Sequence, residues 1–248
     1  MTSFRPCALI PVYNHPDFLP TLVQTLRAQN LPVILVDDGS EPSCAAVIAG
    51  LAEAEGVEVL RHAKNSGKGA AIMSGLKKSR ELGFSHALQV DADGQHHLAD
   101  IPKLLAAARA QPDAIISGQP VFDARVPKSR LYSRYITHVW VWINTLSLHI
   151  RDSMCGFRVY PVAACCELIA DTDMGPRMSF DTEILVRHFW RGGTVISIPT
   201  PVTYLENGVS HFRILEDNLR LSGMHARLFF GMLLRLPLLL WQNRQRRA

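Results

Sequence analysis

Two aspartates separated by one residue follow the short, mainly apolar run Leu88-Gln89-Val90. Because residues i and i+2 of an extended strand point the same way, Asp91 and Asp93 would be aimed together from the end of a buried strand. Paired carboxylates repel each other unless a cation lies between them, and Mg²⁺ accepts one or two protein carboxylates together with water and phosphate oxygens. The pair predicts a metal that holds a diphosphate. The alternative is a solvated turn, which uses the same residue types.

Other polar residues that could take part in binding or catalysis also follow apolar runs. One run ends in Tyr13-Asn14 and another in Asp37-Asp38, whereas Gly67-Lys68-Gly69 opens a predicted helix. In an open parallel sheet, ligands bind at the carboxyl ends of the strands, and a helix N-terminus attracts anions. These residues therefore favour a phosphate-binding edge. The glycine-rich turn matches neither a dinucleotide fingerprint nor a Walker A loop.

The elements that must position these residues alternate in the first half of the chain. Hydrophobic periodicity predicts strands over 7–12, 32–36, 57–60, 86–90 and 113–117, and helices over 17–29, 44–54, 70–82 and 101–110. The strands are too apolar to face water, so we expect an α/β fold with a Rossmann-like, mostly parallel central sheet and helices on both faces.

The regular alternation of predicted strands and helices ends beyond residue 118. We expect a polar loop over 119–128, helices over 129–150, 163–170 and 180–190, a strand over 155–160, and two edge strands beside prolines over 195–198 and 202–205. This division predicts a nucleotide-binding half (1–118) and an acceptor half (119–212) of one domain.

Composition limits the class of protein. The 248 residues are 48% apolar, which supports a real core, and the net charge of +4 does not by itself indicate nucleic acid. The five cysteines have no metal-type spacing, and Cys7, Cys165 and Cys166 are expected to be buried and reduced, which suits the cytoplasm. The first six residues have no signal-peptide pattern.

The last segment, 213–248, is predicted to form an amphipathic, basic helix from Ile214 to Trp241. Arg213, Arg220 and Arg227 recur every seven residues, and the continuous apolar part is shorter than the ~20 residues of a membrane span. We expect this helix to lie at a membrane surface, peripherally on the inner face of the cytoplasmic membrane. The alternative is packing on the domain or on a second copy, and formation of a homodimer is left open.

Six motifs occur in a set order: Ile10-Pro11-Val12-Tyr13-Asn14, Val36-Asp37-Asp38-Gly39-Ser40, Asn65-Ser66-Gly67-Lys68-Gly69-Ala70, Asp91-Ala92-Asp93-Gly94-Gln95-His96, Cys155-Gly156-Phe157-Arg158 and Phe180-Asp181-Thr182-Glu183. Together they resemble family 2 glycosyltransferases of the GT-A fold over residues 7–215. Within that family, the chain is most similar to the polyprenyl-phosphate (dolichol-phosphate) mannosyl and glucosyl transferase branch.

The resemblance implies a nucleotide pocket at the ends of the first two strands. Pro11, Tyr13 and Asn14 would line this pocket. Asp37 would accept a hydrogen bond from the base, and Asp38 would support that turn.

The resemblance also implies a diphosphate site. Lys68 would lie near the nucleotide or its phosphates. The Asp91-Ala92-Asp93 motif would bind the donor, with Asp91 and Asp93 holding Mg²⁺ or Mn²⁺ together with Gln95. A metal there would stabilise the negative charge of the departing diphosphate.

Reaction by direct displacement, with inversion at the sugar carbon, is implied by the same resemblance. A hydroxyl acceptor needs a general base, for which Asp181 and Glu183 are the candidates, whereas a phosphate acceptor is already anionic. Capping of the predicted helix is an alternative role for Asp181, and the two roles are compatible.

Candidate contacts for the acceptor or the diphosphate lie in the second half: Arg130, Arg134, Arg158, His211 and Arg213. Arg130 and Arg134 precede an aromatic, apolar helix face, which suits a lipid with an anionic head. The branch often has an arginine after the Ser-Gly that here precedes Gln119, and a Ser-Lys pair where this chain has Ser210-His211. These departures weaken the match to a phosphate acceptor.

The sequence thus predicts a metal-dependent inverting transferase that moves one sugar from a nucleotide-diphospho-sugar to a membrane lipid. Polyprenyl phosphate is the first candidate for this acceptor. A single transfer is expected because the processive Gln-x-x-Arg-Trp pattern is absent. One alternative is transfer to a hydroxyl of a glycolipid or other lipid. Another is a catalytically silent nucleotide-sugar-binding protein. No nucleic-acid partner is expected.

Overall fold

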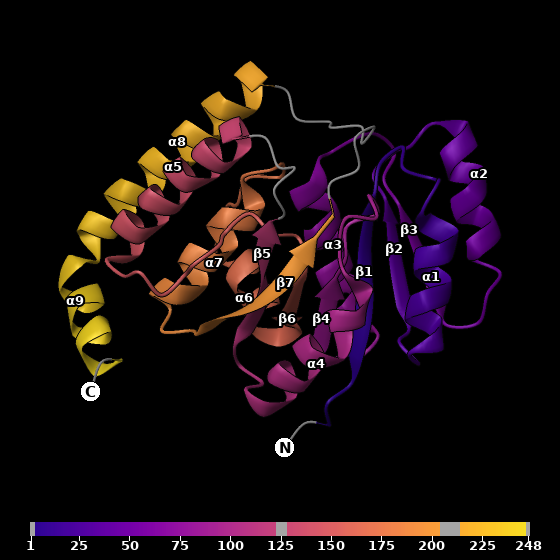
Figure 1. The fold of residues 1–248 in the computed structure, drawn as a ribbon, viewed down its shortest axis with the longest axis horizontal. Coiled ribbons are helices and arrows are strands. Elements are labelled where there is room, and N and C mark those ends of the chain that lie inside the picture. The colour runs from indigo at the N-terminus through magenta and orange to yellow at the C-terminus, as the bar shows by residue number, and fades with distance from the viewer. Residues whose placement is uncertain (1–2, 123–127, 204–213, 247–248) are drawn as a thin grey trace.

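The computed structural model describes residues 3–122, 128–203 and 214–246, and Figure 1 shows its course. The elements are β1 (Pro6–Val12), α1 (Leu19–Ala28), β2 (Val33–Asp37), α2 (Pro42–Leu51), β3 (Val57–Arg61), α3 (Lys68–Glu81), β4 (His86–Gln89), the 3₁₀ helix η1 (Leu98–Asp100), α4 (Ile101–Ala110), β5 (Ile115–Phe122), α5 (Lys128–Thr145), β6 (Arg158–Pro161), α6 (Val162–Ala170), α7 (Phe180–Trp190), β7 (Val195–Val202), α8 (Ile214–Leu234) and α9 (Leu236–Gln245).

Seven strands form one sheet in the order β3-β2-β1-β4-β6-β5-β7. The four strands β1–β4 are parallel, and β7 is parallel to β5, whereas β6 runs antiparallel to both β4 and β5. The predicted α/β fold with a mostly parallel sheet is confirmed. The antiparallel β6 is the departure from an all-parallel arrangement, and it pairs Gln89 with Arg158.

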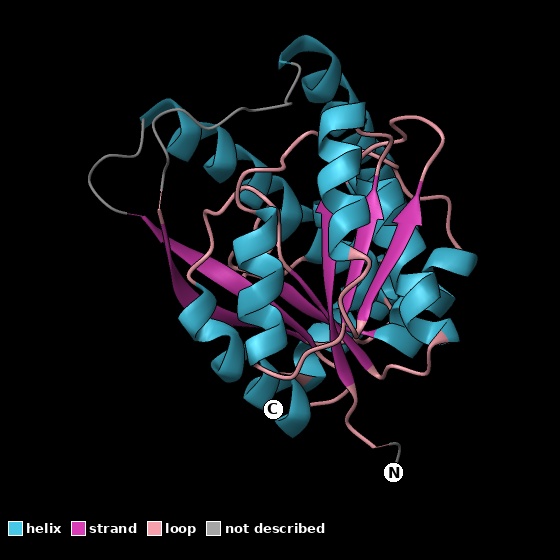
Figure 2. Ribbon diagram, turned by 90° about the vertical axis from the view of Figure 1, so that its right-hand side faces the viewer, coloured by secondary structure: helices cyan, strands magenta, loops and turns pink. Residues whose placement is uncertain are grey.

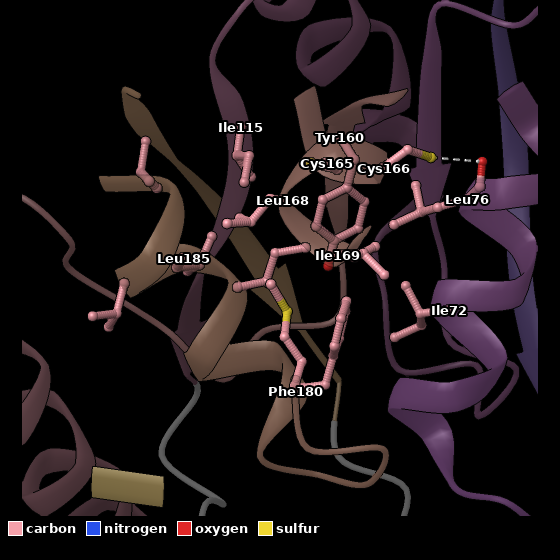
Figure 3. Packing of buried hydrophobic residues seen from close by; sticks show 14 of the residues in the cluster. Ile72, Leu76, Ile115, Tyr160, Cys165, Cys166, Leu168, Ile169, Phe180 and Leu185 are labelled. Carbon is pink, nitrogen blue, oxygen red and sulfur yellow. Dashed lines mark hydrogen bonds between the residues drawn. The ribbon is translucent and has the colours of Figure 1, made fainter. Parts of the chain in front are cut away.

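The sheet is covered on both faces, as Figure 2 shows. Alternate β1 side chains point to opposite sides. Cys7 and Leu9 pack with α3, α6 and α7, whereas Ala8 and Ile10 pack with α1, α2 and α4. Figure 3 shows the first of these cores, where Ile72 and Leu76 of α3 approach Tyr160 and α6.

All five cysteines are free and buried, which confirms the prediction for Cys7, Cys165 and Cys166. Burial raises the pKa of Cys7 and of Cys155 to about 12. In the core of Figure 3, the Cys166 thiol donates to the Leu76 carbonyl at 3.4 Å.

An outer layer of α5, α8 and α9 covers α7, and Figure 1 shows α5 and α8 side by side. Met224, Leu228 and Met232 form the buried stripe of α8. The single C-terminal helix predicted over 214–241 is wrong, because α8 and α9 meet at an 80° bend. Pro237 explains where α9 starts, since proline lacks an N–H and is tolerated in a first turn.

Among the described residues, no single helix combines the length and apolarity needed to span a membrane, and α8 and α9 meet that test only as a bent pair.

Other boundaries also differ from the prediction, and strand β5 continues to Phe122, into the polar loop predicted over 119–128. Helix α5 ends at Thr145 rather than 150, because Leu146 has a left-handed φ of 51°. Strand β6 starts at Arg158 rather than 155. The two predicted edge strands are one strand, β7, which tolerates Pro199 and Pro201 because it lies at the sheet edge.

Candidate active site

The carboxyl ends of β1, β2 and β4 meet at one edge of the sheet because these strands are parallel neighbours. Asn14, with a φ of 53°, joins the first two loops: its Oδ1 accepts from the Glu41 N–H at 2.8 Å, and its own N–H donates to Ser40 Oγ at 3.1 Å. Pro11 and Tyr13 flank this junction and are partly exposed. The predicted nucleotide-pocket residues are therefore brought together.

Asp37 ends β2, Asp38 follows it, and both are buried. Asp38 accepts hydrogen bonds from the N–H groups of Ser66 at 2.9 Å and Gly67 at 2.7 Å, and so fixes the loop before α3. Asp37 Oδ1 accepts from the Ser40 N–H at 2.8 Å. Within the described residues, Asp37 Oδ2 has no hydrogen-bond donor, although Arg61 Nη1 lies 3.2 Å away. A buried acceptor of this kind suits an N–H group of a base.

Lys68 lies between two carboxylates from opposite halves of the chain. Its Nζ is 2.7 Å from Asp91 Oδ2 and 3.2 Å from Asp181 Oδ2. Burial alone would lower the pKa of Lys68, but the attraction of Asp181 and Asp91 outweighs it and raises that pKa above its ordinary value. Burial opposes charge on Asp91 too, yet Lys68 and His96 hold the pKa of that carboxyl below its usual range. This ionic cluster is the centre of the site.

Two residues that the sequence did not single out orient Asp91. Gln89 Nε2 donates to Asp91 Oδ1 at 2.9 Å, and the Tyr160 hydroxyl donates to Gln89 Oε1 at 2.9 Å. Gly156 packs directly on the other side, where a Cβ atom would overlap the Asp91 carboxylate. The antiparallel pairing of β6 with β4 produces this arrangement, and the sequence carries no local signal for it.

His96 lies beside the same carboxylate. Its Nε2 is 3.7 Å from Asp91 Oδ2, and its ring stacks on Phe157 with centroids 5.1 Å apart. Neither ring nitrogen has a hydrogen-bond partner in the described part of the chain, although both are buried. His96 is therefore placed to contact a group bound next to Asp91.

The two candidate bases on α7 have different surroundings. Asp181 faces Lys68, and its Oδ1 is buried, 3.7 Å from Arg158 Nη1. Glu183 is fully buried and accepts from Arg187 Nη2 at 2.7 Å and from the Gly175 N–H at 3.0 Å. Glu183 thus holds the loop before α7, not the ionic cluster. Helix α7 has no side-chain capping bond, so the capping role considered for Asp181 is not observed.

The loop held by Glu183 completes the wall behind Lys68. The Ala70 N–H donates to the Pro176 carbonyl at 2.8 Å. A Cβ atom at Gly69 would lie 2.5 Å from the Phe180 Cβ, so only glycine permits this approach. The glycine-rich turn therefore serves close packing between the two halves.

The predicted arginine contacts are engaged within the protein where they can be described. Arg158 is fully buried and donates to the carbonyls of Asp181 at 2.5 Å and Ser153 at 2.8 Å. Arg134 makes a bidentate pair with Asp152, at 2.6 and 2.7 Å. Arg158 fixes the start of α7, and acceptor contact by either arginine stays a prediction.

The remaining predictions cannot be placed in the same way. Arg130 lies in the first turn of α5, but its side chain is outside the described part of the structure. His211 and Arg213 also lie outside the described residues.

The residues predicted to hold a metal offer oxygen ligands of the kind Mg²⁺ and Mn²⁺ prefer. Asp91 and Asp93 are partly exposed, and Ala92 between them is buried. Asp93 Oδ1 accepts from the Gln95 N–H at 3.1 Å across a turn in which Gly94 has a φ of 71°. In the described part of the chain, no three His, Cys, Asp or Glu side chains form a metal cage. The donor set therefore fits a cation whose shell is completed by water and phosphate oxygens, not a closed protein site.

The layered fold, with an Asp-Ala-Asp pair at the carboxyl edge of its sheet, defines a GT-A type protein. The sequence model described as "Glycosyl transferase family 2" matches residues 7–168, more than half of the chain. The chain belongs to this family and is a glycosyltransferase. The predictions of the family and of an enzyme are confirmed.

The chain is similar to two bacterial enzymes of lipid-linked sugars. It is 29% identical over 223 residues to the polyprenol monophosphomannose synthase of Mycolicibacterium smegmatis. The match covers 83% of this chain and 80% of that protein. It is 26% identical over 208 residues to the undecaprenyl-phosphate mannosyltransferase of Micrococcus luteus, which covers 82% and 84% respectively. These relatives support the predicted branch of the family.

Solved structures share the fold. Glucosyl-3-phosphoglycerate synthase of Mycobacterium tuberculosis, crystallised with Mn²⁺ and UDP-glucose, superposes with a TM-score of 0.65 at 15% identity, covering 94% of this chain and 79% of that one. At this identity the likeness concerns the fold alone.

Proposed function

We propose that this glycosyltransferase moves one sugar from a nucleotide-diphospho-sugar to polyprenyl phosphate at a membrane surface. The observation that carries the proposal is the ionic cluster, in which Lys68 Nζ lies 2.7 Å from Asp91 and 3.2 Å from Asp181. It joins the strand-end motif of the donor half to the helix of the acceptor half. The names of the bacterial relatives supply the class of acceptor.

On the donor side, Asp37 would accept from the base, and Asp91, Asp93 and Gln95 would hold Mg²⁺ or Mn²⁺. When bound, the metal supplies Lewis-acid stabilisation of the diphosphate. Lys68 adds a fixed positive charge beside the same leaving group. Gln89 and Gly156 keep the Asp91 carboxylate in one orientation, so little reorganisation is needed as charge develops on the diphosphate.

On the acceptor side, the surroundings of Asp181 favour a phosphate over a hydroxyl. A hydroxyl nucleophile must lose a proton to a base within hydrogen-bond reach. Asp181 has Lys68 at 3.2 Å on one oxygen and Arg158 at 3.7 Å from the other, while Glu183 is committed to Arg187. A lipid phosphate is already anionic and would be attracted by Lys68. It would displace the diphosphate directly, with inversion at the sugar carbon.

Membrane contact at the inner face of the cytoplasmic membrane is part of the proposal. The outer layer carries large exposed apolar side chains on all three helices, including Tyr132 and Ile136 of α5, Phe230 and Leu234 of α8, and Trp241 of α9. Aromatic and aliphatic side chains of this kind, next to arginines, suit the boundary between head groups and acyl chains. Burial of this face by a second copy is the alternative that a mass measurement in solution would reveal.

The test is a transfer assay with labelled UDP- and GDP-linked hexoses, with undecaprenyl phosphate or undecaprenol as the acceptor, in Mg²⁺, Mn²⁺ or EDTA. We expect a charged lipid product only from the phosphate and only with metal. The Asp91→Asn/Asp93→Asn variant should retain its fold and lose transfer. Equal activity with undecaprenol would favour the hydroxyl alternative, and full activity of the double variant in EDTA would refute the metal role.

A further inference from the structure

A cavity of about 440 Å³ lies at the other end of α7, between the end of α6 and the α8 helix. It starts at Arg187, six residues beyond Asp181, or ~9 Å along the helix axis. Four arginines line it, namely Arg187, Arg191, Arg227 and Arg235. They face only two carboxylates among the lining residues, Asp171 and Asp173. Neither the motifs nor the transfer reaction uses this cavity.

Residues of three helices hold Trp190 in the cavity wall. Its Nε1 donates to the Asn144 carbonyl of α5 at 2.8 Å. A Cβ atom at Gly231 of α8 would come within 2.9 Å of the ring. The guanidinium carbon of Arg235 lies 4.9 Å from the ring centroid and that of Arg187 lies 6.0 Å from it. An aromatic ring that holds planar cations in this way limits the rotamers that they can adopt.

The four arginines differ in how far their charge is already neutralised. Arg187 bonds to Glu183 at 2.7 Å, and Arg191 to Asp171 at 2.8 Å. Arg227 reaches Glu183 only at 3.7 Å, with its side chain 59% exposed. Arg235 donates to a carbonyl, that of Gly231, at 3.0 Å. Two guanidinium groups therefore line the cavity without a close carboxylate among the described residues.

We propose that this cavity binds an anion of the phosphate class, a phosphomonoester or a diphosphate, through Arg227 and Arg235. Their planar forks can each donate two parallel hydrogen bonds to phosphate oxygens. Trp190 would form an apolar wall beside the bound anion. The anion is carried either by a lipid head group or by a soluble phosphate. Exposed Leu233 and Leu234 directly precede Arg235, so a head group could enter while its chains contact these side chains. The proposal does not depend on the transfer reaction.

The experiment measures binding of inorganic pyrophosphate by calorimetry, and of phosphatidylcholine vesicles with and without phosphatidylglycerol by sedimentation, all in EDTA. We expect Arg227→Gln/Arg235→Gln to weaken binding of at least one ligand about tenfold. A matched control, Lys103→Gln/Arg109→Gln, removes two exposed charges from α4 on the opposite face of the sheet and should change binding less than twofold. Lys68→Met removes the ammonium group of the donor site. Binding that survives in the Lys68→Met variant therefore does not take place at the donor site.

The two sources of the anion give different results. Weakened pyrophosphate binding with unchanged vesicle binding identifies a soluble phosphate, and the reverse identifies a lipid head group. The proposal is overturned if the wild type binds neither ligand, or if the double variant and its control behave alike. Arg235→Lys keeps the charge but lacks the planar fork of the guanidinium group, so it tests the site even if the double variant fails to fold. Unchanged binding in Arg235→Lys also counts against the proposal.

Discussion

The two ends of α7 show how one helix serves two different electrostatic environments. Its first turn carries Asp181 and Glu183, and its last turn carries Arg187 and His188, which is the distribution that the helix dipole favours. The charges alone therefore reveal no function. The difference lies in the partners: Asp181 shares Lys68 with Asp91, whereas Glu183 is saturated by Arg187 and a backbone N–H. A carboxylate that shares its counter-ion across two halves of the chain is the better candidate for chemistry.

The largest effect should come from removing that shared cation. Lys68→Met leaves Asp91 and Asp181 without their common partner, and we expect transfer to fall by about 10²–10³-fold. The matched control is Lys78→Met on the same helix, whose partner is the half-exposed Glu58 at 3.1 Å, and it should stay near wild-type activity. Initial rates at saturating donor measure the effect. Similar losses of activity in the two variants would show that Lys68 matters no more for transfer than Lys78 does.

Asp181→Asn and Glu183→Gln should separate activity from stability. We expect the first variant to lose about 10²-fold in kcat with a modest change in Tm, since Asp181 faces Lys68 in the proposed site. The second should lose about 3 kcal/mol of unfolding free energy, because partly buried Arg187 loses its charged partner at the fully buried position 183, and should keep most of its kcat per folded molecule. Urea denaturation and single-turnover rates measure the two effects. The reverse pattern would make Glu183 the functional carboxylate.

Gly156→Ala tests how finely Asp91 is placed. The added Cβ overlaps the carboxylate, so Asp91 must move, and we expect about a tenfold loss in kcat. Gly50→Ala is the control, because a Cβ atom there meets nothing within 4 Å. That helical glycine should yield unchanged activity and a gain of ~0.5–1 kcal/mol in stability. Wild-type kcat in Gly156→Ala would show that the edge tolerates movement of Asp91.

The smallest effect is a pH dependence at the C-terminal end of α7. Burial lowers the pKa of His188 to about 4, against ~6.5 for an unfolded chain. The unfolded state therefore binds more protons between those values, so stability is complete above pH ~6.5 and falls as pH decreases toward 4. The slope approaches ~1.4 kcal/mol per pH unit from this residue alone. Urea denaturation from pH 7.5 to 4.5 should show a shallower slope in His188→Asn, and equal slopes would exclude His188 as the source.

His225 adds a parallel effect between α5 and α8. Burial lowers its pKa to about 4 as well, and its Nδ1 lies 3.4 Å from Asn144 Nδ2. Because protonation would place a charge between these helices, the outer layer should be the first part to loosen in acid. Hydrogen exchange at pH 5 would localise that loss.

Prediction from the sequence placed the polar strand ends correctly, because their positions follow from chain order. Asp37 and Asp91 stand at the ends of apolar runs, and parallel pairing brings such ends together without further information. It was weaker where contacts depend on the direction of a distant strand. Tyr160 reaches Gln89 only because β6 runs antiparallel, and Glu183 meets Gly175 only because of the loop between them. Neither of these contacts leaves a periodic signal in the sequence.

The burial of all five cysteines has a practical consequence for studying this enzyme. Thiolates, not thiols, react with alkylating reagents, and the raised pKa values of Cys7 and Cys155 keep those groups protonated at neutral pH. A cysteine introduced at exposed Ser222 of α8 would then be the fastest-labelling thiol in the chain. A single spin label at that position would test whether the outer layer enters a bilayer, as proposed, without first removing any native cysteine.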